Sequence, residues 1–511
     1  MVEREWREAS DMRQSTLTLA AVLMVAALLR FWALDSGIPS TLGVDEPQIM
    51  ARSVAMMKAG TLNPGGFFDY PGLYLYVQMA VACVRFLAGA MTGKWRTLND
   101  VGPIDFYLWG RAVTALFGTL TVLVVYRIGL RWGSRYALLA AALMAVAPLH
   151  VRESHYVLTD VPMAFFVALT FLFSLGAHEQ PTARTFAKAG AAAGLAAATK
   201  YPGAIALLMP LLALWMTAGT RPWRRAGTLA TVGAAAAAFL IAAPYTILDL
   251  PGFLNGFATL AAGYAGAPPP EPGWLLYLKH LRINLHWPAL LLLAAGMALA
   301  VVRIVRGPGR VRWTLAIAFP LVYYYSIASQ TLIFARYLLP LTPFLCVLIA
   351  AAVVSGVSLL RRFEIPRAVR TALIAGLTVA VLFPLVMQAI GFNRLISRRG
   401  TMDAAYSWIA DNLPEGSQVM GETGRLILPP AYRFSHIRQL RERPIHDYRE
   451  RGVEYLIASS ESYGRYLSEP HKYPREYAEY MQLFGQAREL VRFTPSNEQP
   501  GPEIIILKVK P

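Results

Sequence analysis

Two adjacent carboxylates, Asp45 and Glu46, lie about ten residues beyond the first apolar run, residues 15–34. Acidic side chains are costly so close to a bilayer, and chains that keep them there usually have a function for them. A carboxylate within hydrogen-bond reach of a hydroxyl can take its proton and make it a nucleophile. Asp45 could also cap a helix that begins at Pro47, because Asp before Pro is a common helix start. We expect Asp45 to be the base of a catalytic pair with Glu46, and the two interpretations are compatible.

Two basic residues at the ends of later apolar runs, Lys200 and Arg336, are suited to bind a phosphate carried by a lipid. Arg offers a planar fork of donors, and Lys offers a compact point charge. Cations at the departing oxygen would stabilise the transition state as well as bind the phosphate. Each could instead extend along the lipid toward the headgroups. We expect Lys200, Arg336, Tyr337 and Arg111 to bind the donor phosphate. In an alternative interpretation, Arg111 is a structural brace that pairs with a neighbouring carboxylate.

A third set of residues is predicted to contact the substrate. It comprises His155, Asp160 and Tyr201. Carboxylate and imidazole groups can also ligate a divalent cation, so this is the one cofactor that the set could hold. No spacing among them is diagnostic of a metal site. His155 could equally be a hydrogen-bonded interfacial residue, and Asp160 could cap the helix that continues through Val161 and Pro162.

The composition is that of an integral membrane protein. Of the 511 residues, 56% are hydrophobic and only 15% are charged, whereas soluble domains are about one quarter charged. The net charge of +17 comes from Arg residues in short clusters between apolar runs, which is typical of loops that face anionic lipid and not of a nucleic-acid surface. The two cysteines, Cys83 and Cys346, lie inside apolar segments and are predicted to be packing residues.

Apolar runs long enough to span a bilayer recur along the first four fifths of the chain. They lie at residues 15–34, 105–130, 136–150, 160–178, 186–200, 203–219, 226–246, 287–306, 312–328, 335–360 and 367–391. Arg clusters follow every second run, which predicts that those loops are cytoplasmic. A further apolar run at 72–92 then cannot cross, and we expect it to lie along the outer interface or to enter and return. The first run has no cleavage site after it and is predicted to be a signal anchor.

The predicted organisation is therefore a membrane module of about 11 spans over residues 1–392 and a soluble α/β domain over 393–511. The first external loop covers about 35–104 and carries Asp45 and Glu46. A Pro-rich segment, 267–273, is predicted to be an irregular loop over the site. The C-terminal domain has short apolar runs at 417–421, 453–459 and 504–509 that predict buried strands, and helical patterns at 404–413 and 471–485.

Several motifs, in order over about 400 residues, resemble those of a known superfamily. They are Gly43-Val44-Asp45-Glu46-Pro47, Tyr70-Pro71-Gly72-Leu73-Tyr74-Leu75, Arg111 with Tyr126-Arg127-Ile128-Gly129, Pro148 to His155 running into Thr159-Asp160-Val161-Pro162, Ala198-Thr199-Lys200-Tyr201-Pro202-Gly203, and Phe334-Ala335-Arg336-Tyr337-Leu338-Leu339-Pro340. Together they resemble the GT-C superfamily of polyprenyl-phosphate-sugar-dependent glycosyltransferases. The similarity is greatest to the branch that holds the dolichyl-phosphate-mannose protein mannosyltransferases and the bacterial aminoarabinose transferase of lipid A.

This resemblance implies a mainly α fold, a polytopic helical bundle with juxtamembrane helices in the external loop and an exoplasmic C-terminal domain. It implies an inverting transferase in which Asp45 is the base or a metal-site residue, with a polyprenyl-phosphate-linked sugar as donor and membrane lipid as partner. The protein would be a multi-pass protein of the inner or plasma membrane, with its active site and C-terminal domain on the periplasmic or extracellular side. Relatives often carry Lys-Pro-Pro where this chain has Tyr70-Pro71-Gly72, so Lys200 or Arg336 must bind the phosphate without that lysine.

Two functions from different classes remain open at this point. The first is a glycosyltransferase that moves a sugar to a hydroxyl of a protein, lipid or glycan on the outer face. The second is a transporter or flippase of a lipid-linked sugar, since multi-span chains with buried charges often transport. The predicted gathering of charged residues at one outer level, with no acidic residue at the midplane, favours the enzyme. A third interpretation, in which the C-terminal domain alone is active and the rest is an anchor, needs far fewer spans than are present.

Overall fold

The computed structural model describes residues 2–41, 43, 45–217, 221–264, 269, 271–307, 309–423, 425–429 and 431–510, without the side chains of 2–13, 221 and 222. The chain divides into two compact units. The first, here called the membrane unit, comprises Met1–Leu34 and Gln48–Phe392. The second, the C-terminal unit, comprises Asp35–Pro47 and Asn393–Pro511. The sequence analysis assigned residues 35–47 to the membrane module. In the structure these residues belong to the C-terminal unit instead. Residues 267, 268 and 270 of the Pro-rich segment 267–273, predicted to be a loop over the site, lie outside the described residues.

The membrane unit is helical throughout. Its α-helices are α1 (Val2–Phe31), α2 (Glu46–Ala59), α3 (Gly72–Met91), α4 (Tyr107–Gly129), α5 (Ser134–Val146), α6 (Pro148–Glu153), α7 (Asp160–Glu179), α8 (Ala183–Thr199), α9 (Leu208–Met216), α10 (Arg221–Ala242), α11 (Tyr245–Leu248), α12 (Leu250–Gly263), α13 (Gly273–Arg306), α14 (Arg310–Ala328), α15 (Thr342–Leu360) and α16 (Arg367–Ile396). Short 3-10 helices precede α4, α9 and α15, namely η1 (Leu98–Asp100), η2 (Pro103–Asp105), η3 (Tyr201–Leu207) and η4 (Ala335–Leu341). Every apolar run predicted to span coincides with one of these helices.

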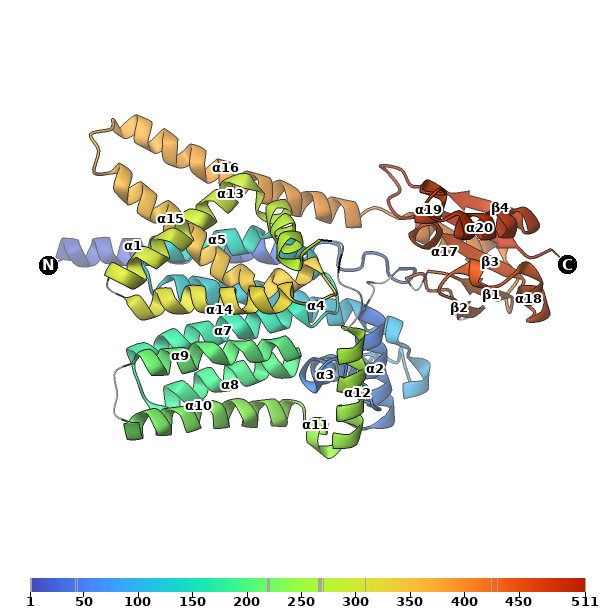
Figure 1. Cartoon of the computed structure of the whole chain (residues 1–511), viewed down its shortest axis with the longest axis horizontal. Helices are drawn as coiled ribbons and strands as arrows, with labels where there is room; N and C mark the ends of the chain where they lie inside the picture. The colour runs from blue at the N-terminus through green and yellow to red at the C-terminus, as the bar shows by residue number, and fades with distance from the viewer. Residues whose placement is uncertain are drawn as a thin grey trace. The chain divides into compact units, whose positions relative to one another are not determined.

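The helices of the bundle run side by side, whereas α2 and α12 stand across them at one end (Figure 1). By length and composition alone, 8 of the helices in the described part of the chain could cross a membrane, and α3 is one of them. In Figure 1, however, α3 lies at the same end of the bundle as α2 and α12. The predicted helical membrane fold with a small C-terminal sheet domain is confirmed. The predicted number of crossings, about 11, stays a prediction.

Small residues allow two helices of the bundle to pack very closely. A Cβ atom on Gly190 of α8 would lie 2.1 Å from the Thr231 carbonyl oxygen of α10, and one on Gly194 would lie 2.2 Å from that of Ala235. These glycines stand four residues apart and therefore on one face of α8, the spacing that lets backbones approach in membrane helix pairs. The Ala-rich runs of both helices serve the same close contact.

We therefore expect Gly194→Ala to lower the melting temperature of the detergent-solubilised protein, because the added methyl overpacks the α8–α10 contact by about 1–3 kcal/mol. The matched control is Gly233→Ala on α10, where a Cβ would meet nothing within 4 Å. Ala is the better helix former by about 1 kcal/mol, so the control should be as stable as the wild type or more so. Equal melting temperatures for the two variants would contradict the close contact.

The C-terminal unit contains a five-stranded sheet with the order β2-β1-β3-β5-β4. Its strands are β1 (Gln418–Gly421), β2 (Arg433–His436), β3 (Tyr455–Ser459), β4 (Arg488–Phe493) and β5 (Ile504–Lys508), and its helices are α17 (Thr401–Asn412), η5 (Leu440–Glu442), α18 (Ile445–Glu450), α19 (Ser460–Ser468) and α20 (Pro474–Gln486). Strand β1 pairs in parallel with β2 and β3, and β5 pairs antiparallel with β3 and β4. The predicted strands β1, β3 and β5 are confirmed. The edge strands β2 and β4 were not predicted, because neither contains a buried residue.

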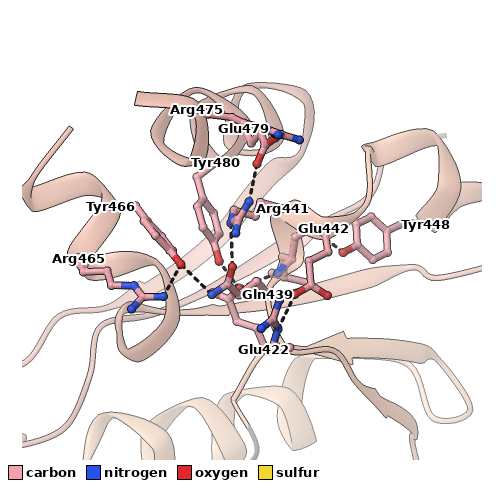
Figure 2. A network of polar contacts seen from close by, with 12 residues as sticks. Glu422, Gln439, Arg441, Glu442, Tyr448, Arg465, Tyr466, Arg475, Glu479 and Tyr480 are labelled. Carbon is pink, nitrogen blue, oxygen red and sulfur yellow. Dashed lines mark hydrogen bonds and ion pairs between the residues drawn. The ribbon is translucent and has the colours of Figure 1, made fainter. Parts of the chain in front are cut away.

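A buried carboxylate connects the elements of this domain (Figure 2). Glu422 follows β1 and accepts hydrogen bonds from the Leu440 amide at 2.8 Å, the Tyr480 hydroxyl at 2.7 Å and the Ser459 amide at 2.9 Å. Burial raises the pKa of Glu422 from 4.5 to about 7, against the opposing effect of these three donors. The carboxyl therefore changes its charge near neutral pH while it joins β1, β3, η5 and α20.

The raised pKa predicts that the domain loses stability as pH rises toward 8. Between the unfolded pKa of 4.5 and the folded pKa of about 7, the folded domain holds a proton that the unfolded chain releases. This contribution is complete below pH 4.5 and is lost as pH rises through 7. In the full-length protein, the opening free energy of the β3 amides by hydrogen exchange should fall between pH 5 and pH 8 by up to about 3 kcal/mol. Glu422→Gln should flatten the dependence, and an unchanged slope in that variant would assign it to another group.

Candidate functional site

One carboxylate and two cations meet in the membrane unit. The Lys200 Nζ atom lies 2.7 Å from the Asp160 Oδ1 atom, and the Arg336 Nε atom lies 3.8 Å from the Asp160 Oδ2 atom. The exposed fractions of the three side chains are 3% for Asp160, 10% for Lys200 and 19% for Arg336. We call these three side chains, two cations and one carboxylate, the Asp160 cluster, and the buried Glu153 carboxylate interacts electrostatically with two of them. Lys and Arg side chains are the groups that proteins use to bind phosphate and carboxylate ligands.

Breaks in the helices place the two cations. Lys200 ends α8 in an extended conformation, with φ −156° and ψ 133°, and Pro202 in the first turn of η3 cannot continue α8. Gly203 lets η3 fold back, because a Cβ there would lie 2.3 Å from the Ala196 carbonyl oxygen. Arg336 similarly stands in the first turn of η4, after the extended Phe334. Both cations therefore project from helix ends, where the Lys-Tyr-Pro-Gly and Ala-Arg-Tyr sequences interrupt the helices.

The carboxylate comes from the start of the neighbouring helix. Asp160 is the first residue of α7, directly after the N-cap residue Thr159. Its carboxylate faces Lys200 and Arg336, so its main partners are side chains of other elements. The sequence left open whether Asp160 caps its own helix, and the structure instead places it within the first turn with an ion-pair role.

Tyrosines surround the Lys200 ammonium. The Nζ atom lies 4.6 Å from the ring centroid of Tyr337 and 6.0 Å from that of Tyr70, within the range of cation–π attraction. The Tyr337 and Tyr264 hydroxyl oxygens are 2.8 Å apart, and the Tyr201 hydroxyl donates to the Phe68 carbonyl at 2.9 Å. These bonds hold the rings in place around the cation.

A cavity of about 480 Å³ opens beside this cation, a volume typical of small-molecule sites. Its polar lining includes Asp69, Tyr70, Lys200, Tyr201, Tyr264, Tyr323 and Tyr337, and its apolar lining includes Phe257, Leu260, Ala261 and Ile327. Sequence reasoning identified Lys200, Tyr201 and Tyr337 but missed Tyr264 and Tyr323. Tyr323 lies inside an apolar run and Tyr264 precedes the Pro-rich segment, and neither position carries a motif.

Two predicted site residues, Arg111 and His155, contact the chain where it leaves α1. The Arg111 Nη1 atom donates to the Leu34 carbonyl at 2.8 Å, and its guanidinium lies 5.8 Å from the Tyr156 ring centroid. The His155 Nε2 atom lies 2.9 Å from the Trp32 carbonyl oxygen, and its Nδ1 atom 2.8 Å from that of Val151. Binding a phosphate or a metal through these atoms would require displacing the backbone partners. The structure therefore gives both residues a bracing geometry.

The acidic pair lies in the C-terminal unit at the start of α2. The helix begins at Glu46, so the predicted helix start at this motif is confirmed. The Glu46 Oε2 atom accepts from the Gly43 amide at 2.7 Å, and the Glu46 side chain is buried. Glu46 is thus engaged in closing the turn that contains Asp45. Of the pair, Asp45 is the candidate for proton transfer.

The described residues do not fit a resident divalent cation. Within the described ranges, no group of three His, Cys, Asp or Glu side chains is arranged to hold one. The Asp160 oxygens face Lys200 and Arg336, and one Glu46 oxygen accepts from a backbone amide. Metal sites require several free oxygen or nitrogen donors at one point. No step of the proposed chemistry is routed through a metal.

Comparison with known proteins gives the fold of the chain. Residues 75–260 match the model of the dolichyl-phosphate-mannose-protein mannosyltransferase family. The apo oligosaccharyltransferase of Archaeoglobus fulgidus aligns over 96% of this chain and 76% of its own, with 12% identity and a TM-score of 0.59. ArnT from Cupriavidus metallidurans, crystallised with undecaprenyl phosphate, aligns over 97% and 98%, with 15% identity and a TM-score of 0.57.

The chain has the GT-C glycosyltransferase fold. The resemblance predicted from the sequence motifs is confirmed, and the matched family and both solved structures are glycosyltransferases. No curated protein matches the chain in sequence. The family-model match includes Arg111, His155, Asp160 and Lys200, whereas Asp45 and Arg336 lie outside it.

Removing one member of the Asp160–Lys200 pair should destabilise the protein more than removing both. Asp160→Asn leaves two cations without their carboxylate, and Lys200→Met leaves a carboxylate with Arg336 alone. Breaking one side of a buried pair costs about 3–5 kcal/mol, whereas replacing both charges can be nearly neutral. We expect each single variant to melt well below the wild type in detergent and the double variant to regain part of the loss. Strictly additive losses would show that the two side chains are energetically independent.

Proposed function

We propose that this GT-C chain is an inverting glycosyltransferase that moves a sugar from a polyprenyl-phosphate donor to a hydroxyl acceptor. The observation that carries the proposal is the Asp160 cluster, whose Lys200 lines a cavity together with tyrosine and apolar side chains. A lipid-linked sugar phosphate needs each of these features: a cation for the phosphate, aromatic faces for the sugar and apolar walls for the lipid. Two proteins of the same fold were solved with related lipids, ArnT with undecaprenyl phosphate and AglB with dolichol-phosphate.

The proposed reaction is a single displacement at the anomeric carbon. The acceptor oxygen attacks that carbon while the Asp45 carboxylate takes the hydroxyl proton. The bond from the anomeric carbon to the phosphate oxygen breaks, and its electron pair leaves with the lipid phosphate. Attack from the face opposite the leaving group inverts the configuration. The phosphate gains negative charge as it leaves, so Lys200 and Arg336 stabilise the transition state more than the bound donor.

The remaining assignments follow from the same proposal. Tyr337 and Tyr201 orient the donor beside Lys200, and the acceptor is a hydroxyl of a protein, lipid or glycan. The distribution of Arg clusters supports catalysis on the outer face of the plasma or inner membrane, with the C-terminal unit on the periplasmic or extracellular side. Transport of a lipid-linked sugar has no observation in its favour. The proposal does not use Arg111 and His155 as ligands, because both contact backbone carbonyls.

Asp45→Asn should abolish transfer, because an amide cannot accept the hydroxyl proton. With purified protein in proteoliposomes and radiolabelled polyprenyl-phosphate mannose or aminoarabinose, kcat should fall about 10²–10⁴-fold. Lys200→Gln and Arg336→Gln should raise the donor KM as well as lower kcat. Asp100→Asn is the matched control, since Asp100 is an exposed residue of the same external segment that accepts from nearby backbone amides. Near wild-type turnover by Asp45→Asn would remove Asp45 from the role of base.

A further inference from the structure

The segment that carries Asp45 is held by the C-terminal unit. Ser36 donates from its hydroxyl to the Ile396 carbonyl at 2.5 Å, and the Ile427 amide donates to the Ser40 carbonyl at 2.9 Å. Thr41 forms an antiparallel β-bridge with Leu426. Residues 35–47, here called the Asp45 segment, therefore pair with backbone that lies more than 350 positions further along the sequence.

A buried side-chain contact reinforces this backbone pairing. The Ser40 hydroxyl contacts the Asp403 carboxylate, and Ser40 is only 2% exposed. The other oxygen of Asp403 accepts from the Gly400 amide at 2.6 Å and so caps the start of α17. Leu426 lies in the loop between β1 and β2, but its side chain is buried in a hydrophobic cluster of the domain. The groups that hold the segment are thus anchored to the folded core of the C-terminal unit.

The chain just before the segment is braced within the membrane unit. The Leu34 carbonyl accepts a hydrogen bond from Arg111, and the Trp32 carbonyl faces the His155 ring. Within the C-terminal unit the segment is held at Ser40 and Thr41, five and four residues before Asp45. The Glu46 carboxylate accepts from the Gly43 amide. Described residues on both sides of Asp45 are therefore held by hydrogen bonds.

We propose that the C-terminal unit positions the catalytic base, with Ser40 and Asp403 as the positioning residues on its side and Arg111 and His155 as their counterparts in the membrane unit. This inference rests on the proposed function of Asp45. It gives the C-terminal unit a part in the proton-transfer step and none in holding the donor phosphate, whose cations belong to other elements. Loosening the segment should therefore lower kcat and leave the donor KM unchanged.

The experiment compares four variants of the full-length protein in proteoliposomes. Ser40→Ala removes the hydroxyl that contacts Asp403, and Asp403→Ala removes the carboxylate. Asp403→Asn is the conservative variant, because its amide can contact the Ser40 hydroxyl while its oxygen still accepts from Gly400. The matched control is Ser417→Ala, which removes a hydroxyl bond of 2.6 Å to the Pro414 carbonyl within the same domain. Hydrogen exchange of residues 36–46 reports the docking directly, and transfer kinetics report its consequence.

We expect exchange in 36–46 to rise about tenfold in Ser40→Ala and Asp403→Ala, as for the loss of one buried hydrogen bond, and kcat to fall by a similar factor at constant donor KM. Asp403→Asn and Ser417→Ala should match the wild type in both measurements. Unchanged exchange in the Ala variants, or raised exchange with unchanged kcat, would overturn the positioning role. These outcomes are separate from a failure of the proposed function, which would appear as retained turnover in Asp45→Asn whatever the exchange of the segment.

Discussion

The buried Asp160 carboxylate is the group on which the candidate site depends. Lys200 and Arg336 are both largely buried beside it, and buried cations of this kind are stable only when compensated. Asp160 forms ion pairs with both cations. The same carboxylate ties the start of α7 to the end of α8 and to η4, and Lys200 and Tyr337 from these last two places line the cavity. We therefore expect this one interaction to affect both the folding of the region and the anion binding that we propose.

The breaks in the helices explain how Lys200 and Arg336 can stabilise the fold and also be placed to bind an anion. A lysine in the middle of a membrane helix would face lipid or a packed neighbour. Lys200 instead stands at the point where α8 ends and η3 begins, with Pro202 and Gly203 fixing the reversal. Arg336 occupies the corresponding point before α15. Non-helical backbone is tolerated at such a depth where it lines a cavity, and here the breaks and the cavity coincide.

Much of this could be predicted from the sequence because it depends on local pattern. The long apolar runs predicted the helices, and short apolar runs predicted β1, β3 and β5. Lys200 and Arg336 were identifiable because a charge beside an apolar run has few reasons to be there. The edge strands β2 and β4 escaped prediction because exposed strands lack an apolar signature. A bracing role for Arg111 and a hydrogen-bonded role for His155 were among the alternatives from the sequence. Their partners could not be predicted, because they are backbone carbonyl oxygens, which every residue has.

The docking of the Asp45 segment is the clearest case of a feature that no local pattern encodes. It joins Ser40 and Thr41 to Leu426 and Ile427 through main-chain hydrogen bonds, and nothing in either stretch distinguishes it from an ordinary loop. The roles that we propose therefore fall on different units of the chain. Lys200, at the junction of α8 and η3, and Arg336, in η4, belong to the membrane unit, whereas Asp45 belongs to a segment that folds with the C-terminal unit. Under the proposed reaction, changes in the C-terminal unit can alter the placement of the base while the cations proposed to bind the donor phosphate stay unchanged.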